Sequence, residues 1–72
     1  MKKIAYLKLR LRMYERRVNQ KDMAELLGIS VQAFSRKITG KGSFSQKDIV
    51  KICKFLDITI DEIGSYFYAF EV

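Results

Sequence analysis

The chain is short and basic, and its composition excludes several classes of protein. It has 72 residues, with 14 lysines and arginines against 8 acidic residues, a formal charge of +6 and 49% hydrophobic residues. A chain of this length buries only about 60% of its unfolded surface, so we expect one domain with a small core. It has no histidine and a single cysteine, Cys53. Because histidine is the commonest metal ligand and general base, and one cysteine cannot form an internal disulfide, we expect no enzyme, metal site or cofactor.

The two ends of the chain differ in charge. The apolar run after Lys2 and Lys3 covers only residues 4–7, too few for a signal peptide or a membrane-spanning helix, so we expect a cytoplasmic protein. Residues 1–21 hold eight basic side chains and one acid, whereas residues 57–72 hold four acids and no base. We therefore expect an electrically polar molecule whose basic surface attracts nucleic acid or anionic lipid.

The first segment has the periodicity of an amphipathic helix. Its apolar residues recur at intervals of three and four, and Leu9 and Met13 widen the apolar face. The stripe consists of Ile4, Leu7, Leu11, Tyr14 and Val18. Residues 7–13 also alternate apolar and basic side chains, which is typical of a strand. We favour the helix because its pattern continues to residue 18 without turn residues, and we expect the stripe to face the core.

Two short helices joined by a tight turn are predicted next. Asn19 and Asp22 form a capping pair for the first helix, and Gly28 lies where a left-handed C-cap is needed. Ser30 caps the second helix, which ends at a glycine-containing segment. The predicted helices cover residues 20–27 and 31–39.

The second half of the chain predicts a fourth helix, a short fifth helix and a tail. Phe44 precedes a serine cap, and Ile49 can pack back on Phe44 as a hydrophobic staple. The buried stripe of this helix is expected to be Ile49, Ile52, Cys53 and Leu56. Thr59 and Glu62 repeat a capping box for the short helix, after which Gly64 and Ser65 release a tail. We therefore predict an all-α fold of five helices in a single domain, residues 1–72, ending in the aromatic tail 66–72.

The spacing of small and apolar residues between positions 24 and 38 is that of a helix-turn-helix. Ala24 is small where the second helix crosses the first, and Gly28 provides the bend. The inward residues are expected to be Ile29, Phe34 and Ile38. A step of about 100° per residue then places Gln32 and Arg36 outward, with Ser35 and Thr39 on one flank.

The outward side chains are of the types that recognise base edges in the major groove. Arg36 can pair with guanine and Gln32 with adenine, in each case through two hydrogen bonds. Ser35 can bond to several bases, and Val31 can contact a thymine methyl group. The sequence therefore predicts a DNA-reading helix over 31–39.

Residues 19–41 and 48–63 resemble the Cro/CI-type helix-turn-helix repressors. The resemblance covers most of the chain and implies five helices, a bacterial or phage origin and operator DNA as ligand. It implies that Gln20 binds a phosphate, that Thr39 and Lys41 contact the DNA backbone, and that the outward side chains read bases. The base-reading set is Val31, Gln32, Ser35 and Arg36.

Two positions depart from the family pattern. Many members have a buried arginine-glutamate pair where this chain has Met13 and Ile38, and an apolar pair can replace such an ion pair without loss of stability. Lys37 stands where an apolar or small side chain is usual, so it must extend past the core or reach a phosphate. The seating of the reading helix therefore depends on contacts that the family pattern does not provide.

The chain is also similar to short regulators of Gram-positive temperate phages. That likeness implies a CI-type phage repressor as partner in the switch between lysis and lysogeny, beside or instead of operator binding. The alternative function is therefore a modulator that sequesters such a repressor. Membrane binding is the weakest alternative, because we expect the core to need the apolar stripe of the first helix.

The aromatic tail has two interpretations. It either closes the core or forms a surface that binds a copy of the same chain or another protein, since contiguous exposed apolar surface usually marks an interface. The candidate anchors of that surface are Tyr66, Phe67, Tyr68 and Phe70.

Overall fold

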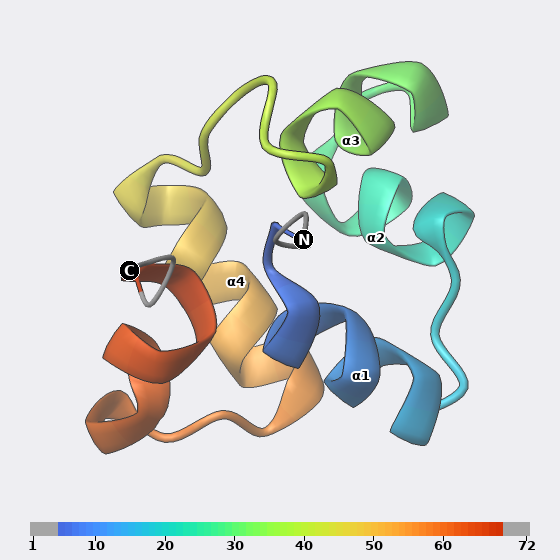
Figure 1. Cartoon of the computed structure of the whole chain (residues 1–72). Coiled ribbons are helices and arrows are strands. Elements are labelled where there is room, and N and C mark those ends of the chain that lie inside the picture. Colours follow the sequence, from blue (N-terminus) through green and yellow to red (C-terminus); the bar gives the residue numbers. More distant parts are fainter. Residues whose placement is uncertain (1–4, 69–72) are drawn as a thin grey trace.

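A computed structural model describes residues 5–68 of the chain. Within that range it contains helices and no strand, which confirms the predicted all-α fold (Figure 1). The elements are α1 (Leu7–Glu15), α2 (Gln20–Leu27), α3 (Val31–Ile38), α4 (Gln46–Leu56), η1 (Ile60–Glu62) and η2 (Gly64–Tyr68). The predicted short fifth helix is thus a 3₁₀ turn, η1, followed by a π-helical turn, η2.

Local hydrogen bonds start and stop the helices at the predicted positions. At the start of α2, the backbone N–H of Asp22 donates to Asn19 Oδ1 (2.8 Å), and the Asn19 N–H donates to Asp22 Oδ2 (3.1 Å). Ser45 and Asp48 form the same reciprocal pair before α4. Such caps satisfy backbone N–H groups that have no partner inside the helix. The boundaries of α2 therefore follow from local sequence.

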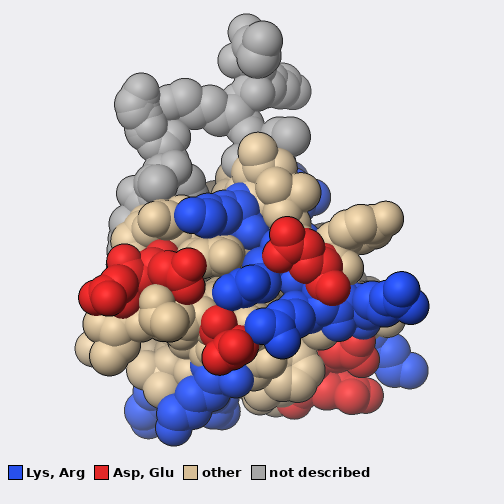
Figure 2. All heavy atoms as spheres, turned by 90° about the horizontal axis from the view of Figure 1, so that it is seen from below, with Lys and Arg blue, Asp and Glu red and all other residues tan. Residues whose placement is uncertain are grey.

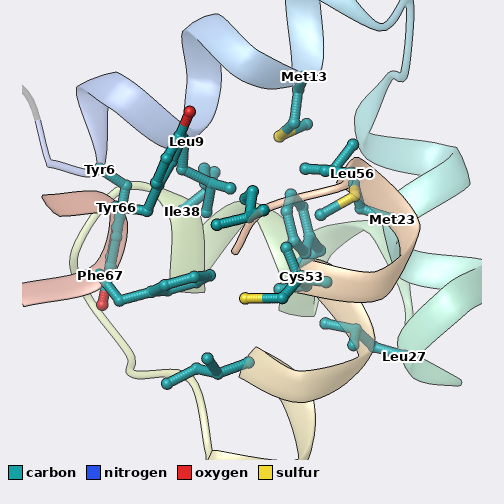
Figure 3. Packing of buried hydrophobic residues seen from close by; sticks show 14 of the residues in the cluster. Tyr6, Leu9, Met13, Met23, Leu27, Ile38, Cys53, Leu56, Tyr66 and Phe67 are labelled. Carbon is teal, nitrogen blue, oxygen red and sulfur yellow. The ribbon is translucent and has the colours of Figure 1, made fainter. Parts of the chain in front are cut away.

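The core contains the opposite face of α1 from the one that the periodicity predicted. Leu9 and Met13 are buried, whereas Leu7, Leu11 and Tyr14 are 48%, 53% and 82% exposed. The middle of the stripe that was expected to be buried is therefore largely in solvent, and the two residues expected to widen it form the real inner face (Figure 3). Of the other two members of the stripe, Val18 packs against the core and Ile4 lies outside the described residues. Membrane binding was judged weak because the core was expected to use this stripe. That argument is wrong, because Leu7, Leu11 and Tyr14 are exposed. Within the described residues, no helix has the length and apolar character needed to cross a membrane.

Two of the C-terminal aromatics, Tyr66 and Phe67, help to close the core, as the first of the two interpretations of the tail expected. The side chains of Tyr66 and Phe67 are buried, and the chain remains helical through Gly64 and Ser65 (Figure 3). The Phe67 ring lies edge-on to Phe44, with the centroids 5.9 Å apart. The predicted release of a tail at residue 66 is therefore wrong for the described part of that segment.

The charges of the two ends meet on one surface. Arg12 Nη2 donates to the carbonyl of Asp57 (3.1 Å), and Arg16 Nη2 lies 3.3 Å from Asp57 Oδ2. Hydrogen bonds from Thr59 are the main cause that lowers the pKa of Glu62, and the positive charges of Arg12 and Lys8 also lower it. Figure 2 shows basic and acidic side chains interleaved on this face. Folding therefore brings Asp57 and Glu62 near basic side chains of the first segment, which removes part of the expected separation of charge.

Replacing Phe67 tests whether the C-terminal segment belongs to the core. Phe67→Ala is expected to lower the free energy of unfolding by about 3 to 5 kcal/mol, because it opens a cavity where the side chain is only 2% exposed. Urea denaturation followed by circular dichroism measures this change. The control is Ile60→Ala, whose parent side chain is 85% exposed and whose loss should change stability by less than about 0.5 kcal/mol. Equal effects of the two changes would contradict the burial of the segment.

Candidate nucleic-acid interface

The turn between α2 and α3 has the predicted geometry. Gly28 adopts φ 71° and ψ 32°, the left-handed conformation that favours glycine. The Ile29 N–H donates to the Ala24 carbonyl (3.0 Å), which closes the end of α2. Ala24 is buried and Ile29 packs against the core. Together these contacts hold α2 and α3 against each other at a short turn, as Figure 1 shows.

The two faces of α3 are sharply different. Ser30 Oγ accepts a hydrogen bond from the Ala33 N–H (3.0 Å), so the helix begins at Val31. Phe34 and Ile38 are completely buried and fasten the inner face of the helix to the core. On the outer face, Gln32 and Arg36 are exposed. The predicted orientation of the helix is therefore confirmed.

The remaining base-reading candidates lie beside this outer face. Val31 is 45% exposed at the first position of α3, and Ser35 is half-buried. Within the described residues, the side chains of Gln32 and Arg36 form no hydrogen bond or ion pair with the protein. Their donors and acceptors are thus available to a ligand.

A rigid turn after α3 sets the position of Lys41. The N–H groups of Lys41 and Gly42 both donate to the Arg36 carbonyl, at 2.9 and 3.2 Å. Gly40 has φ 90°, and a Cβ at this position would lie 3.0 Å from the Cβ of Ala5. Glycine is therefore required both for the backbone conformation and for the close approach of the N-terminal segment. The Lys41 side chain is exposed immediately beyond this turn.

The side chain of Lys37 has a structural contact that the sequence did not reveal. Lys37 Nζ donates to the carbonyl of Ser43 (2.8 Å) and lies 3.9 Å from Asp48 Oδ2. It also lies over the Phe44 ring, 6.0 Å from its centroid. These contacts join the end of α3 to the start of α4. In this conformation the ammonium group is directed into the protein, which does not favour its expected contact with a phosphate.

The other phosphate candidates differ in their exposure and in their hydrogen bonds within the protein. Thr39 Oγ1 donates to the Ser35 carbonyl (2.8 Å), so its proton is already used inside the protein. Gln20 is the first residue of α2 and is half-buried. The neighbouring Lys21 is exposed in the same first turn and was not selected from the sequence. Its only sequence signal was its place next to Gln20.

The structure also places the two positions that depart from the family pattern and the tail residues. Met13 and Ile38 are both buried in the core, as expected for an apolar pair in place of an ion pair.

Tyr66 and Phe67 are core residues, so they are not surface anchors in this conformation. The side chain of Tyr68 and the whole of Phe70 lie outside the described residues.

The single thiol gives no sign of a reactive site. Cys53 is buried on the inner side of α4, and burial raises the pKa of its thiol. A raised pKa reduces the thiolate fraction, and the thiolate is the reactive form. Within the part of the chain that the structure describes, no three acidic, cysteine or histidine side chains are grouped to hold a metal ion.

Comparison with known proteins gives the family. No curated protein sequence matched the chain. The Cro/C1-type HTH DNA-binding domain matches residues 8–67, well over half of the 72 residues. This range contains the turn at Gly28 and the whole of α3. The chain therefore belongs to the Cro/C1-type helix-turn-helix family of DNA-binding domains.

Proposed function

We propose that the chain is a phage-type transcription regulator that inserts α3 into the major groove of operator DNA. The observation that carries this proposal is the division of α3 into a buried face, Phe34 and Ile38, and an exposed face, Gln32 and Arg36. The major groove of B-DNA is wide enough to admit one α-helix. A helix held by one face on a small core presents the other face with little loss of conformational freedom on binding.

Each candidate side chain has a specific contact with DNA in this proposed arrangement. Arg36 donates two hydrogen bonds to a guanine, and Gln32 bonds to an adenine through its amide. Val31 contacts a thymine methyl group, and Ser35 adds a hydrogen bond at the edge of the helix. Lys41, Gln20 and the exposed Lys21 hold the phosphates on either side of the groove. Phosphate contacts set the orientation of the domain, whereas the contacts of α3 set its sequence preference.

The same proposal includes a place in a phage switch. The resemblance of the sequence to short regulators of Gram-positive temperate phages, among them the modulator of repression of a lactococcal phage, is our ground for including a role in the choice between lysis and lysogeny in the cytoplasm of a bacterial host. A CI-type repressor is then the expected protein partner. Action as a homodimer on paired half-sites is a further form of the same function, because helix-turn-helix dimers bind two half-sites one helical turn apart.

An antirepressor that sequesters a CI-type repressor is the second candidate function. The exposed Leu7, Leu11 and Tyr14 of α1 favour it, since solvent-exposed apolar side chains on one helix face are typical of protein interfaces. A gel-shift with the switch region, with and without the repressor, separates the two functions. A regulator retards the duplex without the repressor. An antirepressor does not retard the duplex by itself, and it removes the band of the repressor–DNA complex.

The base contacts are tested by Arg36→Ala and Gln32→Ala on a duplex selected from a random pool by the chain itself. Each change should weaken binding to that duplex by about 1 to 3 kcal/mol and relax the preference at one base pair, while circular dichroism stays unchanged. Lys54→Ala in the last turn of α4 is the control, because it removes an exposed charge outside the helix-turn-helix. Unchanged affinity in both α3 variants would show that α3 does not read bases.

The phosphate contact is tested by Lys41→Ala. This change should weaken binding to all duplexes by a similar factor. It should also reduce the slope of log affinity against log salt by about one unit, because binding then releases about one counterion fewer from the DNA. Fluorescence anisotropy over a series of salt concentrations measures both quantities. Loss of preference at a single base pair, with an unchanged salt slope, would assign Lys41 to base recognition instead.

A further inference from the structure

Helix α1 has more apolar surface than the fold buries. Leu9 and Met13 face the core, and Leu7, Leu11 and Tyr14 follow one another at intervals of four and three residues on the other side of the helix. Side chains at such intervals lie on one face of a helix. This exposed apolar stripe is not used by the core, and it belongs to α1, outside the helix-turn-helix of α2 and α3 (Figure 1).

Two arginines border the stripe where it reaches Tyr14, and the acid beside it, Glu15, is paired with Arg12. Arg10 precedes Tyr14 by one helical turn, and Arg17 follows it in an exposed loop. Within the described residues, neither arginine forms an ion pair or a hydrogen bond through its side chain. By contrast, Arg12 is 3.8 Å from Glu15 and also bonds to Asp57. The side chains of the two arginines beside Tyr14 are therefore available to pair with the acidic groups of a ligand.

A shallow hollow continues the stripe at the C-terminal end of α1. Its lining consists of Tyr14, Glu15, Arg17, Val18 and Asn19. Val18 is half-buried and gives the hollow an apolar side, while Arg17 supplies a positive edge. Such a hollow accommodates one apolar side chain of a partner next to an acidic one.

We propose that this face of α1 docks an amphipathic helix of another protein, with an apolar stripe bordered by aspartate or glutamate. The three anchors lie within eight residues and span about 10 Å of helix, which suits packing against one partner helix. The apolar side chains supply burial, and Arg10 and Arg17 select an acidic border by charge complementarity. The proposal stands independently of whether α3 binds operator DNA.

Two other occupants fit the observations less well. In a symmetric dimer through this face, both copies bring Arg10 and Arg17, and the acid of the same face, Glu15, already lies 3.8 Å from Arg12. The charges of two copies are therefore less complementary than those of the chain and an acidic partner. A membrane surface would bind in proportion to the apolar area that it buries, and α1 offers three such side chains on a helix of nine residues. A flat lipid surface also leaves the hollow beside Tyr14 unfilled.

The test uses the full chain and a fluorescein-labelled synthetic helix of about 18 residues, a length that is helical in water for favourable sequences. The peptide has leucines at intervals of four and three and glutamates on both borders, and a matched peptide has glutamine in place of glutamate. Fluorescence anisotropy gives the affinity of each peptide. The variants are Leu11→Ser, Tyr14→Ser and Arg10→Glu, with Val50→Ser as control, because Val50 is 47% exposed on α4.

The glutamate peptide is expected to bind the chain saturably and more tightly than the glutamine peptide. Leu11→Ser and Tyr14→Ser should each weaken it by roughly tenfold, and Val50→Ser should not. Arg10→Glu should remove the advantage of the glutamate peptide, and none of the α1 variants should change circular dichroism or affinity for the selected duplex.

Three results would overturn the proposal. The first is no saturable binding of the glutamate peptide, or binding that the α1 variants do not weaken. The second is a dimer in sedimentation equilibrium that Tyr14→Ser dissociates, which would assign the face to a second copy. The third is binding to phosphatidylglycerol vesicles that the same variants abolish, which would assign it to a membrane. Because DNA affinity is measured on the same variants, failure here leaves the proposed operator binding unaffected.

Discussion

The attachment of α3 to the core through Phe34 and Ile38 is the interaction on which the rest of the structure depends. Both side chains are completely buried, and they hold a helix of only eight residues whose opposite face is in solvent. A helix this short is marginal in water by itself. Its order comes from this packing, from the Ser30 cap and from the turn at Gly28. Without the two anchors, α3 would lose the orientation that makes Gln32 and Arg36 available to DNA.

The contacts at the far end of α3 support the same seating. The buried arginine-glutamate pair of many related domains is replaced here by Met13 and Ile38, both in the core. The ion pair of Lys37 with Asp48, and its hydrogen bond to Ser43, tie the helix to α4 in a different way. Lys37, which the sequence predicted to extend past the core or contact a phosphate, therefore has a structural role. In the proposed function, the positive charge for DNA comes from Arg36, Lys41 and Lys21.

The elements that could be predicted from the sequence are those set by local interactions. The boundaries of α2 follow from Asn19, Asp22 and Gly28, which act within a few residues of one another. The inner face of α1 could not be predicted, because this helix is apolar on two sides and periodicity cannot tell which side meets the core. The helical turn over residues 64–68 was missed because Gly64 and Ser65 are turn residues locally, whereas Tyr66 and Phe67 are buried in the core by tertiary packing. The contacts of Arg12 and Arg16 with Asp57 also depend on tertiary structure.

A titration of the ¹⁵N-labelled chain with its selected duplex, followed by ¹H–¹⁵N correlation spectra, tests the central claim most directly. If α3 enters the major groove, the largest shift changes fall on the amides and side-chain N–H groups of Val31, Gln32 and Arg36, with smaller changes around Lys41. The amide of Tyr14 and those along the exposed face of α1 should stay in place. Changes centred on α1, with the signals of α3 unmoved at saturating DNA, would contradict the assignment of α3 as the DNA-reading helix.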